Sequence, residues 1–407
     1  MQRRRYVVLG AGRQGRAAAY DLARHAQAGE VALYDRESGC AQAAARRVNE
    51  LLERAGLAAV CRGAQLEVTE PAALQRALEP ADCVLSCVPY FLNEPIAQAA
   101  VAARTSYCDL GGNTAVSDRI LALDPEARAA GVTLTPDCGL APGMANTLAA
   151  CLIERIARPR RAAVRCGGLP QRPRPPLDYM LTFAVEGLTN EYTGAALVLR
   201  EGRVTEIPTF DPAEDESLEV EGVGRLEAFV TSGGSGNLPR TYAGRLEHFD
   251  YKTLRYPGHA ERIRLLLALG LLDREPVTVP DADGNPVSLR PRDLLHERLV
   301  SRLTFPDEPD LVVLLVTAEG LDEHGAAVRH RFEIVDRFDP ETGFTAMERT
   351  TAFPAAIIAA HLASDRAPRG AIPLERVMDG EAFVAELRRR PFAIRESFER
   401  TASPAGV

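Results

Sequence analysis

Tryptophan is absent from this 407-residue chain, and lysine occurs once, at Lys252, so the other Lys/Arg positions are all arginine. No apolar run is long enough to span a bilayer, which argues against a membrane protein. The seven histidines show no paired-ligand spacing, and Cys83 and Cys87 have no second pair, so we predict no metal site. A net charge of −8 argues against nucleic-acid binding, which needs a basic surface.

The eight cysteines are scattered and do not form the spacing of a disulfide framework. In a chain of this length they indicate reduced thiols and a cytoplasmic protein. The apolar run Tyr6–Leu9 ends at Gly10, too early for the core of a signal peptide. With 46% hydrophobic and 26% charged residues, the composition is that of a globular enzyme, and the length predicts two domains.

Short apolar runs alternate with alanine-rich stretches over residues 1–145. This alternation predicts an α/β domain, a Rossmann doubly wound parallel sheet. Strand-like runs dominate residues 146–345, which we expect to form a second, α+β substrate domain, and residues 346–407 are expected to pack back on the first. The runs expected as strands in the second domain are Leu181–Val185, Ala196–Leu199, Val204–Ile207, Leu311–Thr317 and Val328–Val335. The acidic stretch Asp211–Glu221 is expected to be a solvated surface segment.

A glycine-rich turn between the first strand and the first helix is the candidate phosphate-binding site. Its residues are Gly10, Ala11, Gly12, Arg13, Gln14 and Gly15. Glycines permit the tight turn and the close approach of a pyrophosphate, which the helix N-terminus attracts. Asp35 ends the next strand, about 20 residues further on, where a carboxylate binds the adenosine ribose hydroxyls. That carboxylate repels a 2′-phosphate and favours NAD, whereas Arg36 beside it leaves NADP open.

Two later strands end at the same edge of the predicted sheet. Ligands of doubly wound sheets bind in the crevice beyond these strand ends. The candidates there are Val88, Pro89, Tyr90, Asp109, Leu110 and Gly111. An acid followed by glycines at a strand end is best explained by close approach to a ligand. The following run, Asp137–Met144, is either a hinge between domains or a further ligand contact.

Five segments together carry a resemblance to a known family. They are Tyr107–Asn113, Pro136–Met144, Val185–Tyr192, Thr231–Gly234 and Tyr251–His259. The chain resembles the saccharopine dehydrogenase superfamily over nearly its whole length, and within it the lysine ε-deaminating dehydrogenases. The resemblance implies a Rossmann domain, an amino-acid substrate and a homodimer or higher oligomer. It also implies that Pro89, Tyr90, Asp109, Leu110 and Arg255 line the cofactor and the substrate.

The segment Tyr251–His259 supplies the candidate substrate groups. Arg255 offers a planar fork that matches an α-carboxylate. A helical segment would place Lys252, Arg255 and His259 on one face, whereas a strand that turns into a helix near Pro257 would not. His259 fits a core role as well as a catalytic one. Glu186 and Glu191, expected at a strand end, are candidates for holding a substrate cation.

The implied reaction is NAD-dependent oxidation of the lysine ε-amine, with loss of ammonia and cyclisation of the resulting aldehyde. An ammonium of pKa about 10.4 must first lose a proton, so the site needs a base. Lys252 and Asp109 both remain candidates for that base. Saccharopine oxidation is the alternative activity, and a catalytically silent dinucleotide sensor is the alternative from another class.

Overall fold

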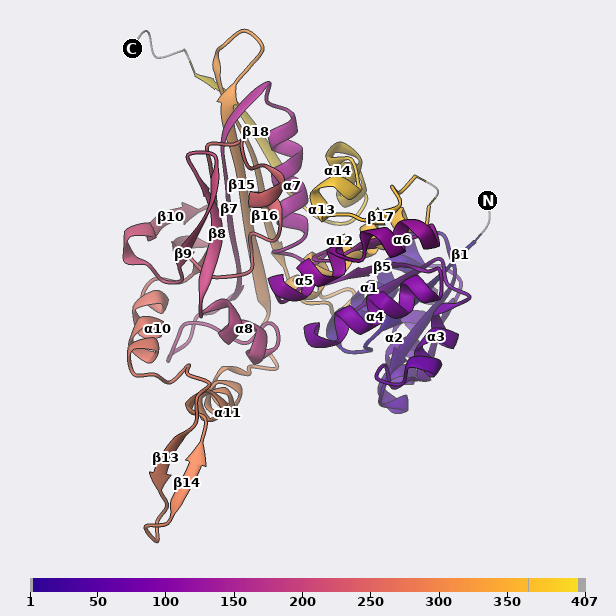
Figure 1. Ribbon diagram of the computed structural model, residues 1–407, viewed down its shortest axis with the longest axis horizontal. Helices are drawn as coiled ribbons and strands as arrows, with labels where there is room; N and C mark the ends of the chain where they lie inside the picture. Colours follow the sequence, from indigo (N-terminus) through magenta and orange to yellow (C-terminus); the bar gives the residue numbers. More distant parts are fainter. Residues whose placement is uncertain (1–2, 365, 402–407) are drawn as a thin grey trace.

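Residues 3–364 and 366–401 are described by a computed structural model, in which two sheets lie side by side (Figure 1). The first is a parallel sheet with the order β17-β6-β5-β4-β1-β2-β3. Its strands are β1 (Arg4–Leu9), β2 (Ala28–Asp35), β3 (Cys61–Gln65), β4 (Cys83–Ser86), β5 (Ser106–Asp109), β6 (Thr133–Thr135) and β17 (Gly370–Ala371). Two βαβ halves diverge from the β1–β4 pair, so the predicted Rossmann fold is confirmed.

The helices of this domain connect consecutive parallel strands. They are α1 (Arg13–His25), α2 (Ser38–Arg54), α3 (Pro71–Leu78), α4 (Asn93–Ala102), α5 (Thr114–Leu121) and α6 (Asp124–Ala130), with a 3-10 turn at Tyr90–Leu92. Small residues let α1 pack closely on its neighbours, because Ala17, Ala18 and Ala19 are all buried in the core that α1 forms with the sheet and with α12 (Ala346–Leu362).

The second sheet is mixed and follows the order β10-β11-β12-β7-β15-β16-β18, with β8 pairing with β12 and β9. Its strands are β7 (Arg158–Pro170), β8 (Ala195–Arg200), β9 (Arg203–Pro208), β10 (Glu216–Val220), β11 (Gly224–Phe229), β12 (His248–Arg255), β15 (Asp310–Leu321), β16 (Ala327–Arg337) and β18 (Ile394–Thr401). The central strand β15 is buried on both faces along Leu311–Val316, which explains its continuous apolar sequence.

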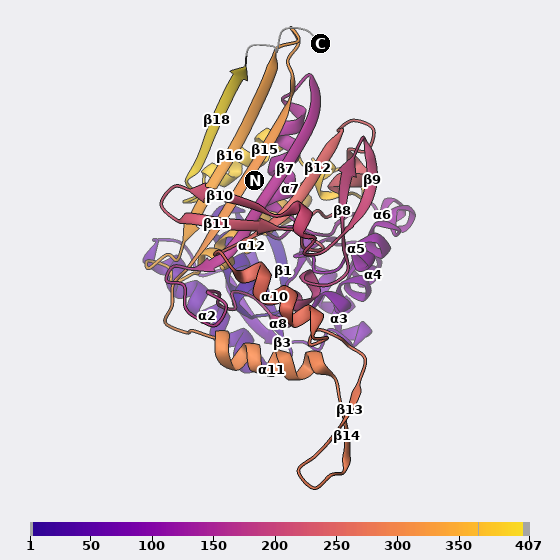
Figure 2. The ribbon, with the colours of Figure 1, turned by 90° about the vertical axis from the view of Figure 1, so that its left-hand side faces the viewer.

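The helices of the second domain cover this sheet or extend below it. They are α7 (Met144–Glu154), α8 (Val185–Glu191), α9 (Leu238–Thr241), α10 (His259–Ala268) and α11 (Pro291–Leu303). The hairpin β13 (Val277–Pro280) and β14 (Pro286–Leu289) protrudes from the domain beside α11 (Figure 2). No helix of the described residues is long and apolar enough to cross a membrane.

One expectation for the second domain is wrong. Leu181–Val185 is not a strand: Val185 begins the helix α8, whose seven residues are too few for a helical period to show in the sequence. The stretch Asp211–Glu221 lies mostly at the surface, as expected, but it also forms the strand β10, and the exposed Glu216 of that strand pairs with the buried Lys252.

The C-terminal part of the chain contributes to both domains. Its elements are α12 (Ala346–Leu362), α13 (Leu374–Val377) and α14 (Gly380–Arg388), together with β17 and β18. The helix α12 packs on α1 and begins with a capping box, in which Thr345 and Glu348 bond each other's backbone N–H. β17 joins the first sheet, while β18 pairs with β16 in the second. Residues 365 and 402–407 of the expected returning segment lie outside the described residues.

Candidate functional site

The glycine-rich turn has the geometry that a dinucleotide diphosphate requires. Gly10 has φ +90°, and a Cβ there would come within 2.8 Å of the Cys87 carbonyl oxygen. A Cβ at Gly15 would lie 1.8 Å from the Gly10 oxygen, so the turn and α1 can approach only through glycine. A Cβ at Gly12 meets nothing within 4 Å, which leaves open space at the start of α1. These residues fit a dinucleotide.

The side chains of Arg13 and Gln14 point away from that open space and toward α12. Arg13 donates to Glu348 at 3.4 Å, and Gln14 donates to the Met347 carbonyl oxygen at 3.4 Å. Both residues therefore fix the turn against α12, and it is their backbone N–H groups at the helix N-terminus that suit a phosphate.

Asp35, at the end of β2, lies beside the same turn. Its carboxylate accepts the backbone N–H of Ala11 at 2.8 Å and that of Glu37 at 3.0 Å. Arg36 is exposed, and no hydrogen bond or ion pair is recorded for its guanidinium within the described part of the chain. The structure therefore places a carboxylate and a free cation side by side at the end of β2.

The strand-end candidates come together around the turn. The side chain of Val88 borders Gly10, from whose added Cβ it would lie 3.3 Å away. Tyr90 packs against Gly112, whose φ of +124° and lack of a side chain allow this contact. Gly111 likewise has no room for a side chain. A Cβ there would lie 3.2 Å from the Pro142 ring and 2.8 Å from the Asp137 carboxylate. Pro89 and Leu110 occupy the adjacent positions of these two turns.

Asp109 is buried and its carboxylate is occupied within its own domain. One oxygen accepts the Tyr107 hydroxyl at 2.7 Å, and the other accepts the N–H groups of Gly111 and Asp137 at 2.7 and 3.0 Å. Burial raises the pKa of Asp109, while these three donors oppose the shift. The carboxylate holds the two strand-end turns in place and has little capacity left to accept a proton from a substrate.

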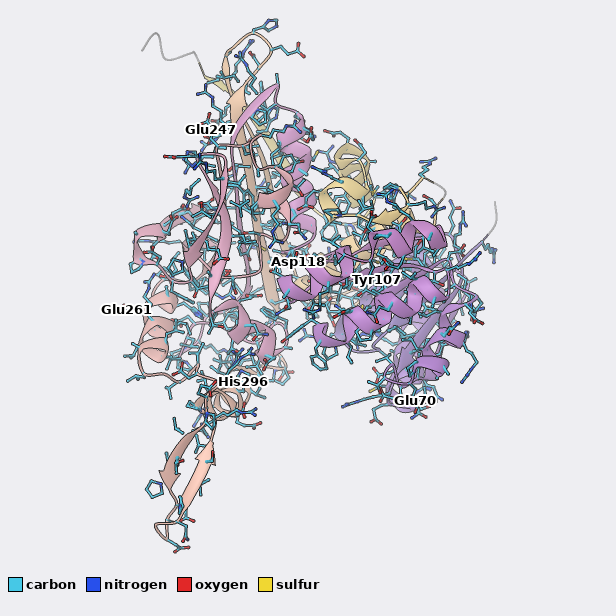
Figure 3. All side chains as sticks on the ribbon, viewed as in Figure 1. Glu70, Tyr107, Asp118, Glu247, Glu261 and His296 are labelled. Carbon is cyan, nitrogen blue, oxygen red and sulfur yellow. The ribbon has the colours of Figure 1, made fainter. Side chains whose placement is uncertain are left out.

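Asp137, the first residue of the run expected as a hinge or a ligand contact, lines a small hollow with Gly236 and Asn237 of the second domain. Its φ is +67°, and its carboxylate accepts the Ser117 hydroxyl at 2.8 Å. Burial, followed by the charge of Asp109, raises its pKa to about 8. Nearby, Figure 3 shows Asp118 at the junction of the domains, where Arg240 donates to its carboxylate at 2.6 Å.

The segment around Lys252 is a strand that turns into a helix, not a continuous helix. β12 ends at Arg255 and α10 begins at His259. Side chains alternate between the two faces of a strand, so Lys252 and Arg255, three residues apart, point to opposite faces. The helical interpretation, which would have placed Lys252, Arg255 and His259 together, is thereby ruled out.

Lys252 lies buried in an ion network on its own face of the sheet. Its Nζ lies 2.6 Å from Glu216, 3.3 Å from Glu214 and 3.6 Å from Asp250. Arg165 on β7 pairs with Glu216 at 2.7 Å and with Asp250 at 2.9 Å. Although burial acts to raise it, the bonds from Arg165 and Lys252 hold the pKa of Glu216 at about 2. The network joins β10, β12 and β7.

Arg255 is only 2% exposed and stands apart from that network. Its guanidinium lies over the Tyr179 ring at 4.5 Å, and Nη1 donates to the Leu254 carbonyl oxygen at 2.8 Å. Its Nε has no hydrogen-bond partner, and no carboxylate of the described residues is within ion-pairing distance. A buried cation without a carboxylate is costly, which points to an anionic ligand.

Glu191, at the end of α8, is the acid whose charge acts on Arg255. Burial raises the pKa of Glu191 to about 7, and the positive charge of Arg255 opposes the shift. No hydrogen bond to its carboxylate is recorded within the described residues. A cation that forms no ion pair with the described residues and an acid that titrates near neutrality therefore lie near each other.

His259 packs behind this pair as a core residue. It is fully buried, Nδ1 donates to the Leu177 carbonyl oxygen at 3.1 Å, and Nε2 accepts the Tyr192 hydroxyl at 2.8 Å. Burial, then the charge of Arg255, lowers its pKa to about 3. The neutral ring of His259 thereby holds the Tyr192 side chain in place beside Arg255.

Glu186 lies in the first turn of α8 and is half-exposed, beside two arginines and a histidine. Its carboxylate lies 3.6 Å from Arg274, 3.8 Å from Arg292 and 3.6 Å from His296. Arg292 is buried and donates to Thr189 at 2.6 Å and to Asn190 at 2.5 Å. Glu186 therefore already has partners that would compete with a substrate ammonium.

A Rossmann sheet whose phosphate turn fits a dinucleotide, joined to a mixed-sheet domain that holds a buried cation, defines a two-domain protein of the dinucleotide-binding class. Two family models match, "Saccharopine dehydrogenase NADP binding domain" over residues 6–135 and "Saccharopine dehydrogenase C-terminal domain" over residues 139–392. The chain belongs to the saccharopine dehydrogenase family.

Curated relatives are about a quarter identical to this chain over the aligned region. Saccharopine dehydrogenase [NADP(+), L-glutamate-forming] of Pyricularia oryzae is 26% identical over 226 residues, 52% of this chain and 48% of that protein. The Saccharomyces cerevisiae enzyme of the same name is 26% identical over 219 residues, 51% of this chain and 47% of that protein. The matches thus span about half the length of these relatives.

The fold has a close counterpart among solved structures. Apo saccharopine dehydrogenase (L-Glu forming) from Saccharomyces cerevisiae matches with a TM-score of 0.75 and 19% identity. The match covers 97% of this chain and 100% of the other. At this identity the likeness establishes the shared two-domain fold.

Proposed function

We propose that this protein catalyses the NAD-dependent oxidative deamination of the ε-amine of L-lysine. Hydride transfer to NAD converts the ε-amine to an imine, which water hydrolyses to allysine and ammonia, and allysine then cyclises with its own α-amine to 1-piperideine-6-carboxylate with loss of water. The observation that carries the proposal is Arg255, a buried guanidinium without a carboxylate partner in a member of an amino-acid dehydrogenase family.

Arg255 binds the single α-carboxylate of lysine. The guanidinium presents paired N–H donors that suit a carboxylate, and its stacking on Tyr179 fixes the plane of the fork. A substrate carboxylate supplies the charge that the described residues leave unpaired. One strong unpaired cation suits a substrate with one carboxylate.

Glu191 accepts the proton that the ε-ammonium must lose before oxidation. A base works best when its pKa is near the working pH, and burial brings the pKa of Glu191 to about 7. It replaces the two bases considered from the sequence, since Lys252 is held by three carboxylates and Asp109 by three donors. Once protonated, Glu191 returns a proton to the departing ammonia.

A bound nicotinamide would accept the hydride from the ε-carbon. The glycine-rich turn holds its diphosphate, and Asp35 binds the adenosine ribose hydroxyls at the end of β2. Because a carboxylate there repels a 2′-phosphate, NAD is the preferred form. The name of the matched domain and the names of the relatives mention NADP, and the exposed Arg36 could face a 2′-phosphate. Activity must therefore be measured with both NAD and NADP.

Oxidation of saccharopine is the second candidate. Saccharopine carries three carboxylates, and two further arginines, Arg274 and Arg292, lie along α8 against Glu186 and Asn190. The names of the curated relatives also favour it. Against it, the recorded partners of Arg292 are already Thr189, Asn190 and Glu186.

A turnover panel tests the proposal. Purified protein is incubated with lysine or saccharopine and with NAD or NADP, while reduced cofactor, ammonia and glutamate are measured. We expect ammonia from lysine with NAD. Glutamate from saccharopine as the dominant product would promote the second candidate, and the absence of any cofactor reduction would favour a silent dinucleotide sensor.

A further inference from the structure

The helix α8 is short, and Glu191 is its last residue. Its seven residues make about two turns, and a helix of that length is unstable in water on its own. The position of α8 therefore depends on the groups that bind it from outside. The contacts made to its last residues also set where the Glu191 carboxyl lies.

Arg292 of α11 makes several of these contacts through one nitrogen, where α11 lies against α8 (Figure 1). Its Nη2 donates to the Thr189 hydroxyl oxygen at 2.6 Å and to the Asn190 amide oxygen at 2.5 Å. The same nitrogen lies 3.5 Å from the carbonyl oxygen of Glu186. The guanidinium thus bonds to both turns of α8, and Asn190 directly precedes Glu191.

Arg292 is itself held in place. Its backbone N–H donates to the Asp273 carbonyl oxygen at 3.2 Å. Its Nε donates at 3.4 Å to Nε2 of His296, which Figure 3 labels. A guanidinium in this position acts as a fixed support rather than as a mobile surface charge.

The charge of Arg292 is poorly compensated for a packing role alone. The residue is 3% exposed, and the one carboxylate recorded within 4 Å of it among the described residues is the half-exposed Glu186, at 3.8 Å. Burial and then the charge of Arg274 lower the pKa of Arg292, yet arginine stays protonated in proteins. A buried cation with so little compensation is costly, so its retention calls for a task.

Other groups fix the main chain at the end of α8. The Ser232 backbone N–H donates to the Glu191 carbonyl oxygen at 2.9 Å, and the Ser232 hydroxyl donates to the Asn190 carbonyl oxygen at 3.0 Å. These bonds hold one point of the helix. Arg292 holds two consecutive side chains, at positions 189 and 190, and so fixes the rotation of α8 about its own axis.

We propose that Arg292 is a positioning residue for the acid–base step: it fixes the rotation of α8 and thereby holds the Glu191 carboxyl beside Arg255. The proposal rests on the proposed function, in which Glu191 is the base. Arg292 need not touch the substrate to act in this way. A displacement of ~1 Å at a reacting group can cost roughly 10²-fold in rate, so a small rotation of α8 is enough.

Steady-state kinetics and NADH binding test the proposal. Arg292→Met should lower kcat at least tenfold, while KM for the amino acid and the dissociation constant for NADH stay within about twofold of wild type. Arg292→Lys keeps a single cationic nitrogen for Thr189 and Asn190 and should recover kcat to within about threefold. Arg298→Met removes an exposed arginine from the same helix and should leave all three constants unchanged.

A variant on the α8 side keeps the test valid if Arg292→Met does not fold. Thr189→Val removes one acceptor of Arg292 and should lower kcat in the same way, by about threefold, again without a change in NADH affinity. Melting temperatures show which variants fold. All variants are measured on whichever amino acid reduces the cofactor in the turnover panel, so a wrong choice of lysine leaves the test of Arg292 intact.

The double variant decides whether Arg292 acts through Glu191. In the Glu191→Gln background, Arg292→Met should cause no further loss of kcat. A further tenfold loss in that background would overturn the proposal. A rise in KM with kcat unchanged in Arg292→Met, or wild-type activity in Glu191→Gln, would also overturn it.

Discussion

Lys252 and Arg255 belong to one strand but point to opposite faces of the second sheet, the first into a saturated ion network and the second into a setting where it forms no ion pair with the described residues. Two cations that look equivalent in the sequence thereby acquire different tasks. The network fixes β10 to β12, and the unpaired guanidinium is available to a ligand.

Arg255→Gln should reduce kcat/KM for lysine by about 100-fold or more, in line with the 2–5 kcal/mol typical of truncating a buried charged pair. Without substrate, the melting temperature should stay the same or rise, because the variant removes a buried cation that lacks a carboxylate. Arg262→Gln, on the exposed side of α10, is the matched control and should retain activity. Unchanged kinetics in the Arg255 variant would contradict the proposal that Arg255 binds the substrate carboxylate.

Lys252→Arg keeps the charge of the network and should leave kcat within about threefold of wild type. Lys252→Met leaves Asp250 and Glu216 short of a partner and should cost roughly 2–3 kcal/mol of unfolding free energy, discounted because Glu216 is partly exposed. Stability comes from denaturant unfolding, and kcat from steady-state assays. A fall in kcat of roughly 10²-fold in Lys252→Arg would instead return the base role to Lys252.

Glu191 should make kcat/KM fall on the acidic side of the pH profile, which we call the acidic limb. The base must be ionised, so kcat/KM should be high above pH 7 and fall as the pH drops through about 7. Glu191→Gln should lose this limb and reduce the rate by 10²–10⁴-fold, the usual scale for general base catalysis. Survival of the limb in the variant would assign it to another group.

The same residue has a measurable effect on stability. A carboxyl whose pKa is raised in the fold destabilises the protein when it is ionised, above that pKa, and has no effect when it is protonated in both states. Glu191→Gln should therefore raise the melting temperature more at pH 8 than at pH 5. An equal shift at both pH values would mean that Glu191 is not held in a buried, ionisable state.

The Rossmann half could be predicted from the sequence because its signals are local. A glycine-rich turn lies between a strand and a helix, and Asp35 follows at the end of the next strand. The strand order and the positions of Val88 and Tyr90 beside the turns follow from the way parallel strands end at one edge.

The site residues of the second domain could not be predicted in the same way. Glu191 becomes important through α8, a helix of seven residues, and through its nearness to Arg255, which lies 64 residues further along the chain (255 − 191). Lys252 finds its carboxylates on β10 and in the turn before it, a segment whose acidic sequence suggests only a solvated surface. Such pairings depend on tertiary packing, which the local pattern does not encode.

Asp35 should set the cofactor preference. With wild-type protein we expect a higher kcat/KM for NAD than for NADP, and replacement of Asp35 by Asn should narrow that difference by removing the charge that repels a 2′-phosphate. Glu37→Gln, at an exposed position two residues after Asp35, is a suitable control. Equal or better use of NADP by the wild type would contradict the NAD assignment.

The central claim is that the buried Arg255 selects a substrate with one carboxylate. The most direct measurement compares lysine with saccharopine under the preferred cofactor, with ammonia and glutamate quantified against reduced dinucleotide. We predict one ammonia per reduced dinucleotide from lysine, and a kcat/KM for lysine that exceeds the value for saccharopine by at least about tenfold, or about 1.4 kcal/mol in transition-state binding. Glutamate release from saccharopine at a rate equal to or above ammonia release from lysine would contradict the account.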